Sequence, residues 1–306
     1  MRDFGPLNAN SVGTLMKEAV RRAIVAIRTH RFNFEARAKL RAHGDTTPDF
    51  VTTADSAAQE VFVTLLRTWF PTFGIIAEED HLRVPCTHPH NDLWFTLDPL
   101  DGTRAFMRRQ SHGIGTMVSL ICDGVVIGAC VGDVMTSEVY AARPDDPAVH
   151  RVSEFGIAER LEIDPNRTLA NQWVLVCERP RRPVPTILTR LGLEQGGVFG
   201  GFESTAGSIG IAMARVWKSE VGGAIFGPFL RGGTPWDLYP VFGISRRLGF
   251  RFYLLDDNAI TPWEPTIHRD GTPVPHEILC IHESRHDELF DWLRVRGDLE
   301  IGHTTG

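Results

Sequence analysis

Apolar residues recur with a helical period in two segments near the N-terminus. In residues 10–31, one helical face gathers Val12, Leu15, Met16, Ala19, Ala23, Ile24 and Ile27. Residues 53–69 repeat their apolar positions in the same way, and Pro71 ends that pattern. The sequence therefore predicts two amphipathic helices, at 10–31 and 53–69.

Shorter apolar runs, separated by turn residues, predict strands along the rest of the chain. Residues 116–142 contain consecutive strands, with Asp123-Gly124 as a hairpin turn. Loops are predicted at 143–155 and at the glycine-rich segment 194–208. The other predicted strands are 73–80, 93–98, 173–178, 223–227 and 250–255, and the other predicted helices are 185–192, 207–219 and one after Trp236.

Helices and strands alternate, but hairpins replace strict strand–helix–strand units. This order favours a layered α/β protein with mixed sheets over a Rossmann fold, and neither GxGxxG nor GxxxxGK[ST] occurs in the sequence. A chain of 306 residues is long enough for two domains. We expect an N-terminal α+β half at residues 1–150 and a C-terminal α/β half at residues 151–306.

The net charge, the apolar stretches and the cysteines limit which partners and which compartment we expect. The net charge is -6 and no basic stripe stands out, which argues against nucleic acid. The N-terminus lacks the apolar core of a signal peptide, and the longest apolar stretch, 124–132, is too short to span a bilayer. Five cysteines without CxxC spacing suit reduced thiols. We therefore expect a cytoplasmic protein that does not bind membranes.

Acidic residues follow two of the predicted strands. Glu78 and Glu79 follow the first strand, and Asp98 and Asp101 follow the second, on either side of Leu100. Carboxylates gathered at one sheet edge repel each other unless cations neutralise them. Oxygen ligands without cysteine or histidine suit Mg²⁺. The spacing of the two aspartates lets both side chains and the carbonyl between them face one point.

Each acidic pair also has an ordinary structural interpretation. Asp-Pro and Asp-Gly are common turn formers, and neighbouring glutamates are often solvated. Their joint occurrence at the ends of two apolar strands favours a metal site. Gly102-Thr103 then opens a predicted helix, whose free N–H groups suit a phosphate beside the metal.

Together these motifs resemble the inositol monophosphatase family of Mg²⁺-dependent phosphatases. The matching blocks are DFVTTADSAAQE (49–60), FPTFGIIAEED (70–80), LDPLDGTRAF (97–106) and PWD (235–237), in the family's order. The resemblance is close over residues 49–142 and looser over 204–249. It implies a layered α-β-α-β-α sugar-phosphatase fold with mixed sheets.

The resemblance also implies a ligand set for two or three Mg²⁺ ions. Glu78, Asp98 and the Leu100 carbonyl would hold the first ion, and Asp98, Asp101 and Asp237 would hold the second. A third, weaker ion would lie near Asp55, Glu78 and Glu79. Most ligands thus fall in the N-terminal half, and Asp237 falls in the C-terminal half.

The resemblance assigns catalytic and substrate-binding roles to further residues. Glu79 and Thr103 would orient the attacking water, with Asp55 as a third catalytic residue, and the N–H groups of Gly102 and Thr103 would take phosphate oxygens. Asp237 and Ser208 would line the substrate pocket, although Ser208 would look the same as a helix N-cap. Arg104, together with Arg108 and Arg109, flanks the phosphate region and could contact a second substrate phosphate.

Some positions depart from the family pattern. Ala77 replaces the usual glycine before the two glutamates. Tyr239 and Pro240 replace small residues after Trp-Asp; their bulk suggests a reshaped pocket wall, with Pro240 in the first turn of a helix. Arg231 stands near the place where many inositol phosphatases carry an acidic residue, which suggests a more anionic substrate.

The implied function is Mg²⁺-dependent hydrolysis of a small phosphomonoester, such as an inositol or sugar phosphate, by metal-activated water. A 3′(2′),5′-bisphosphate nucleotidase and a histidinol-phosphate phosphatase of the same superfamily are alternatives. A catalytically silent protein that binds a phosphate ligand is an alternative of another class. The expected partner is a small phosphorylated metabolite, and the family's frequent dimers imply a homodimer.

Overall fold

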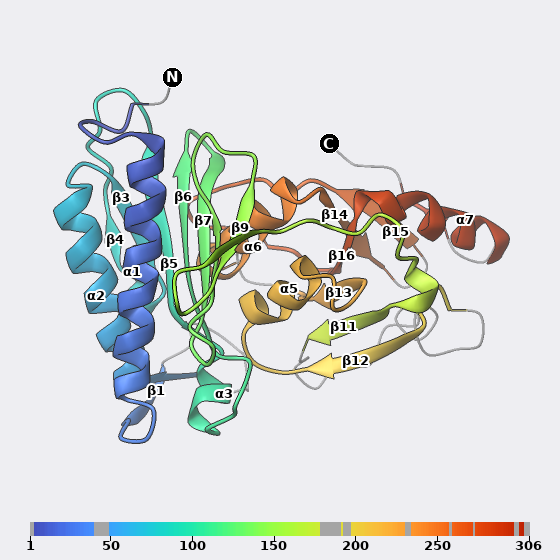
Figure 1. Ribbon diagram of the computed structural model, residues 1–306, viewed down its shortest axis with the longest axis horizontal. Coiled ribbons are helices and arrows are strands. Elements are labelled where there is room, and N and C mark those ends of the chain that lie inside the picture. The colour runs from blue at the N-terminus through green and yellow to red at the C-terminus, as the bar shows by residue number, and fades with distance from the viewer. Residues whose placement is uncertain are drawn as a thin grey trace.

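The computed structural model describes residues 3–39, 49–177, 191, 197–229, 234–256, 259–271, 273–296 and 300–302. Helices and sheets alternate in five layers (Figure 1). The helices α1 (Ala9–Thr29) and α2 (Thr53–Trp69) cover one face of an eight-stranded sheet, and α5 (Ile209–Trp217) and α6 (Pro235–Arg247) separate it from a seven-stranded sheet. On the outer side of the second sheet lies α7 (His286–Arg296). The expected α-β-α-β-α fold is confirmed.

The eight-stranded sheet has the order β10-β9-β8-β7-β6-β5-β3-β4. Its strands are β3 (Gly74–Ala77), β4 (Arg83–Val84), β5 (Leu93–Asp101), β6 (Gly115–Cys122), β7 (Val125–Asp133), β8 (Val139–Ala142), β9 (Val149–Val152) and β10 (Ala158–Arg160). β3 runs parallel to β5, and the other neighbouring pairs are antiparallel. The predicted turn at Asp123-Gly124 joins β6 to β7, and both turn residues have positive φ.

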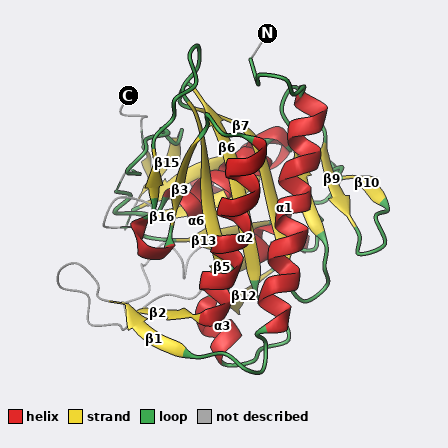
Figure 2. Cartoon of the chain, turned by 90° about the vertical axis from the view of Figure 1, so that its left-hand side faces the viewer, coloured by secondary structure: helices red, strands yellow, loops and turns green. Residues whose placement is uncertain are grey.

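The seven-stranded sheet has the order β12-β11-β13-β16-β14-β15-β17 and is mixed. Its strands are β11 (Trp173–Cys177), β12 (Gly201–Thr205), β13 (Gly223–Phe226), β14 (Phe250–Leu255), β15 (Ala259–Trp263), β16 (Glu277–His282) and β17 (Glu300–Ile301). β11 is parallel to both β12 and β13. A separate ribbon pairs β1 (Ala36–Lys39) with β2 (Asp49–Thr52), next to the short helix α3 (Thr103–Met107) (Figure 2).

Both predicted N-terminal helices are confirmed because their apolar faces are buried against the first sheet. Val12, Met16 and Ile27 of α1 are fully buried in the same core cluster as Phe62 and Leu66 of α2. The start of α2 is fixed by a capping box, in which Thr52 accepts from the helix and Asp55 accepts from Thr52. This cap places Asp55 in the first turn of α2, where it is fully buried.

Two predicted loops are wrong in part. Residues 143–155 contain β9, and the glycine-rich segment 194–208 contains β12. Both strands are short, and their sequences, VHRV and GFEST, do not alternate apolar and polar residues, so pairing with β8 and β11 defines them. Because β9 and β10 belong to the first sheet, that sheet extends to Arg160; the division at residue 150 stays a prediction. The predicted helix at 185–192 lies outside the described residues, apart from Leu191.

The expectations for Tyr239 and Pro240 are corrected. Pro235 occupies the start of α6, so Pro240 lies in the second turn, where a proline cannot donate to the carbonyl four residues earlier. Tyr239 is only 2% exposed; its ring packs near Trp94, and its hydroxyl donates to the His268 carbonyl and accepts from the His268 N–H. Tyr239 is therefore an interior residue that anchors the segment around His268.

None of the helices in the described part of the chain combines the length and the apolar character that a membrane span requires.

Candidate metal centre

Asp98 and Asp101 lie at the end of β5, a strand whose nine residues are all buried. Residues three apart on a regular strand point to opposite faces. Here the pairing with β6 is irregular, because Asp98 faces Met117 and Asp101 faces Gly115, so β5 contains one extra residue. This bulge turns both carboxylates to the same side of the sheet.

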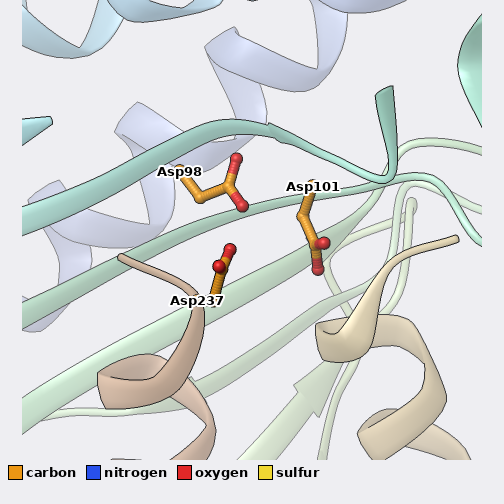
Figure 3. A group of neighbouring side chains, drawn as sticks. All are labelled: Asp98, Asp101 and Asp237. Carbon is orange, nitrogen blue, oxygen red and sulfur yellow. The ribbon is translucent and has the colours of Figure 1, made fainter. Parts of the chain in front are cut away.

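Asp237 reaches the same point from the first turn of α6. Figure 3 shows the side chains of Asp98, Asp101 and Asp237 converging, and one carboxylate oxygen from each lies within 4.8 Å of the others. The N–H of Asp237 donates to the Thr234 carbonyl, and the Thr234 hydroxyl donates to the Asp237 carboxylate. The helix start therefore fixes Asp237 opposite the strand end.

Burial of these acids disfavours their charged forms. Burial, followed by repulsion from Glu78, raises the pKa of Asp98 well above its usual range and that of Asp237 to about 7. Burial also raises the pKa of Asp101 to about 6, against hydrogen bonds that lower it. Three carboxylates, two buried and that of Asp237 partly buried, offer oxygen donors only, which is the ligand chemistry of Mg²⁺. The residues present therefore fit the metal that the sequence predicted.

Glu78 and Glu79 share a partner that the sequence did not reveal. The Lys39 Nζ lies 2.8 Å from Glu78 Oε1 and 2.7 Å from Glu79 Oε1. Burial alone would lower the pKa of Lys39, but the charges and hydrogen bonds of the two glutamates raise it. A single lysine at the end of the exposed strand β1 has no motif around it, so only the folded chain identifies it.

Glu79 is only 4% exposed and its backbone is held by α2. The Gln59 amide donates to the Glu79 carbonyl over 3.0 Å and accepts from the Glu79 N–H over 3.1 Å. Burial, followed by repulsion from Glu78, raises the pKa of Glu79 to about 8. Gln59 is thus a second residue that sequence reasoning missed, although it lies inside the matching block 49–60.

Thr103 connects α2 to the end of β5. Its hydroxyl lies 3.1 Å from both Asp55 Oδ1 and the Leu100 carbonyl oxygen. Burial raises the pKa of Asp55 to about 6. The preceding residue, Gly102, has a φ of 89°, and a Cβ there would collide with the Gly113 carbonyl oxygen. Glycine is therefore required where β5 turns into α3.

The Ser208 side chain is buried and contacts Asp101. Ser208 is 3% exposed, its hydroxyl donates to Asp101, and the same oxygen accepts from the Ile211 N–H as the N-cap of α5. The Gly210 N–H donates to Asp101 Oδ2 over 2.9 Å. The start of α5 therefore holds Asp101 through both side-chain and backbone donors.

The structure gathers most of the predicted site residues into one connected region. Hydrogen bonds, close carboxylate contacts or charge repulsion link the members of this region, which are Asp55, Glu78, Glu79, Asp98, Leu100, Asp101, Thr103, Ser208 and Asp237. Gly102 and Arg104 adjoin this region as the N-cap and second residue of α3, a helix of five residues. Arg231 lies outside the described residues.

Comparison with known proteins places the chain in a family. A profile of the inositol monophosphatase family matches residues 9–264, so the chain belongs to the inositol monophosphatase family. Among curated relatives, the Nus factor SuhB of Xylella fastidiosa is 29% identical over 133 residues, which are 44% of this chain and 46% of that protein. The chain thus spans about half the length of the curated relatives it matches.

Solved structures share the fold over nearly the whole chain. The suhB protein of Bartonella henselae has a TM-score of 0.69 and 17% identity, covering 93% of this chain and 97% of that chain. An IMPase/NADP phosphatase complexed with Mg²⁺ and phosphate has a TM-score of 0.65 and 17% identity, covering 94% and 95%. At these identities the comparison shows the fold.

Proposed function

We propose that this protein is a Mg²⁺-dependent phosphatase that hydrolyses a small-molecule phosphomonoester. The observation that carries the proposal is the convergence of Asp98, Asp101 and Asp237 on one buried point. Family membership and the Mg²⁺ and phosphate bound by a protein of the same fold support it.

In this proposal the acidic residues hold two or three ions. Asp98, Asp101 and Asp237 would bind one ion, while Glu78 and the Leu100 carbonyl would complete the set around a second ion with Asp98. The third, weaker ion would lie near Asp55, Glu78 and Glu79. When bound, Mg²⁺ supplies charge neutralisation and Lewis acidity toward the phosphate oxygens and the attacking water.

The chain's own groups would orient the reactants. Thr103 and Glu79 would position the water, and Asp55 would fix the Thr103 hydroxyl, which lies 3.1 Å away. The backbone N–H groups of Gly102 and Thr103 would bind phosphate oxygens. Water attacks phosphorus, the ester P–O bond breaks, and the leaving alkoxide takes up a proton to become the alcohol.

An inositol or sugar phosphate is the first substrate class to test. A nucleotide bisphosphate is the second substrate class. Arg104 lies in α3 and Arg108 and Arg109 follow it, and one protein of the same fold is named an IMPase/NADP phosphatase. Histidinol phosphate is the third. Arg104, as the second residue of α3, and Ser208, beside Asp101, would border the substrate.

The decisive experiment measures release of inorganic phosphate from this panel with and without Mg²⁺. We expect Mg²⁺-dependent turnover with at least one class, and loss of several orders of magnitude in Asp98→Asn with the fold retained. Asp287→Asn on the exposed side of α7 is the matched control and keeps wild-type activity. If every substrate is bound but none is hydrolysed, the silent phosphate-binding protein replaces the phosphatase.

We also propose that the protein is cytoplasmic and forms a homodimer. The five cysteines are free thiols, which suits a reducing compartment. Cell fractionation tests the location, and light scattering during size-exclusion chromatography tests the dimer; a monomer at all concentrations would contradict it.

A further inference from the structure

The helices α1 and α3 end at the same end of the molecule (Figure 2). Arg31 follows α1, and Arg109 follows α3. Arg31 Nη2 donates to the Gln110 carbonyl, and Arg109 Nη2 lies 3.5 Å from the Phe32 carbonyl oxygen. Each guanidinium therefore reaches the backbone of the other segment.

Two buried polar atoms at this junction have no hydrogen-bond partner among the described residues. They are Arg31 Nη1 and Gln110 Oε1. Arg31 is only 8% exposed, and its other terminal nitrogen binds the backbone of Gln110, so the two atoms belong to one small region. Buried polar groups without partners are rare and costly in folded proteins. A bound species that is not part of the chain would satisfy both.

The positive charge of the two guanidinium groups is also only partly offset. In the part of the chain that the structure describes, no carboxylate pairs with Arg31 or Arg109. The Phe32 ring centre lies 5.9 Å from the Arg31 guanidinium carbon and 5.8 Å from that of Arg109, which offsets part of the charge. The carbonyl end of α1 offsets a further part. Burial, followed by the charge of Arg109, lowers the pKa of Arg31.

These observations distinguish a water molecule from an anion. Water would supply hydrogen bonds but would leave two neighbouring cations. The oxygen and nitrogen of a glutamine amide can exchange places, so Gln110 can present its NH₂ group beside Arg31 Nη1. Two donors and two positive charges then face the same bound species, and an anion satisfies both the hydrogen bonds and the charge.

We propose that Arg31, Arg109 and Gln110 form a binding site for a small oxyanion of the phosphate and sulfate class, separate from the carboxylate centre. Arg109 is exposed, so the site is open to solvent on that side. The Gln110 N–H donates to the Ala105 carbonyl over 3.0 Å and so closes α3. A bound anion therefore ties the end of α1 to the helix that follows Gly102.

Calorimetric titration of the metal-free protein with inorganic phosphate tests the site. Removing divalent ions with a chelator leaves the carboxylate centre without the cations that would bind phosphate there. Arg109→Gln is the test variant because Arg109 is exposed and its loss spares the core. Arg28→Gln removes an exposed charge from the same end of α1 and is the matched control. Circular dichroism verifies that each variant is folded.

We expect saturable phosphate binding in the wild type, at least tenfold weaker binding in Arg109→Gln, and a change of less than about twofold in Arg28→Gln. Sulfate should compete with phosphate. Phosphate binding that is unchanged in Arg109→Gln, or no saturable binding in the wild type, would overturn the proposal. Water would then be the hydrogen-bond partner of Arg31 Nη1 and Gln110 Oε1.

Discussion

At the scale of single residues, Asp101 shows how the centre is held. It accepts from the Ser208 hydroxyl and from the N–H groups of Ile209 and Gly210, so the helix start occupies the side of the carboxylate that faces away from Asp98 and Asp237. The same serine caps α5. One hydroxyl therefore serves both the helix and the proposed metal ligand.

Ser208→Ala should reduce both stability and metal affinity. Loss of the cap and of the bond to Asp101 should lower the unfolding free energy by about 1–2 kcal/mol. The Mg²⁺ concentration for half-maximal activity should rise severalfold, which measurement of activity against Mg²⁺ would show. Ser56→Ala, on the exposed side of α2, is the control and should change neither quantity. An unchanged Mg²⁺ requirement would mean that Ser208 only caps the helix.

Lys39→Met should destabilise the metal-free protein more than the Mg²⁺-bound protein. Without the ammonium group, Glu78 and Glu79 lose their shared partner, at a cost of about 2 kcal/mol. Urea unfolding with and without Mg²⁺ measures the difference. Arg37→Met on the same strand, whose side chain is 70% exposed, is the control. Equal losses in both conditions would indicate a purely structural lysine.

At the scale of elements, the sequence predicted the helices and strands that depend on local signals. The bounds of α2 were predicted from its apolar period and from Pro71, and the structure adds the cap by Thr52 and Asp55. The sequence did not predict the bulge that turns Asp98 and Asp101 to one side. It indicated only that both side chains should face one metal ion. The position of Lys39 and the strands β9 and β12 depend on pairing with another strand, which the residues of these short segments do not reveal by themselves.

Gly102→Ala should cost more than an ordinary substitution of a left-handed glycine. Gly102 has a φ of 89° and its Cβ would meet backbone atoms of Gly113 and Ser208. Gly124 has a φ of 77° with nothing nearby, so Gly124→Ala costs about 1 kcal/mol from the backbone conformation alone. Thermal unfolding should show a loss in Gly102→Ala at least about twice as large. Equal losses would show that the loop moves to accept the methyl group.

At the scale of the whole molecule, the centre joins two layers and the ribbon. β5 brings Asp98 and Asp101 from the first sheet, α6 brings Asp237 from the layer between the sheets, and the β1–β2 ribbon brings Lys39. The charge state of the centre therefore affects the stability of the whole fold.

The metal-free protein should lose stability as the pH rises. Folding raises the pKa of Asp101 to about 6, of Asp237 to about 7 and of Glu79 to about 8, from ordinary values of 3.8 for aspartate and 4.5 for glutamate. The protonated forms thus stabilise the folded state fully below about pH 4, and this contribution is lost as the pH rises through 6 to 8.

Urea unfolding in a chelator should therefore show an unfolding free energy that falls by a few kcal/mol between about pH 5 and about pH 8. Saturating Mg²⁺ should remove most of this fall, because the ions stabilise the charged carboxylates. Asp287→Asn is again the control. Metal-free stability that increases over this interval would contradict the buried, mutually repelling acids.

The separation of Asp237 from Asp98 and Asp101 along the chain has a consequence for biosynthesis. During synthesis, β5 leaves the ribosome well before α6. Asp237 can therefore join Asp98 and Asp101 only after most of the polypeptide has been translated. During that interval Lys39 can already pair with Glu78 and Glu79, but the ion that we propose between Asp98, Asp101 and Asp237 lacks one of its ligands. Loading of this ion is therefore a late event, which follows the docking of α6 between the two sheets.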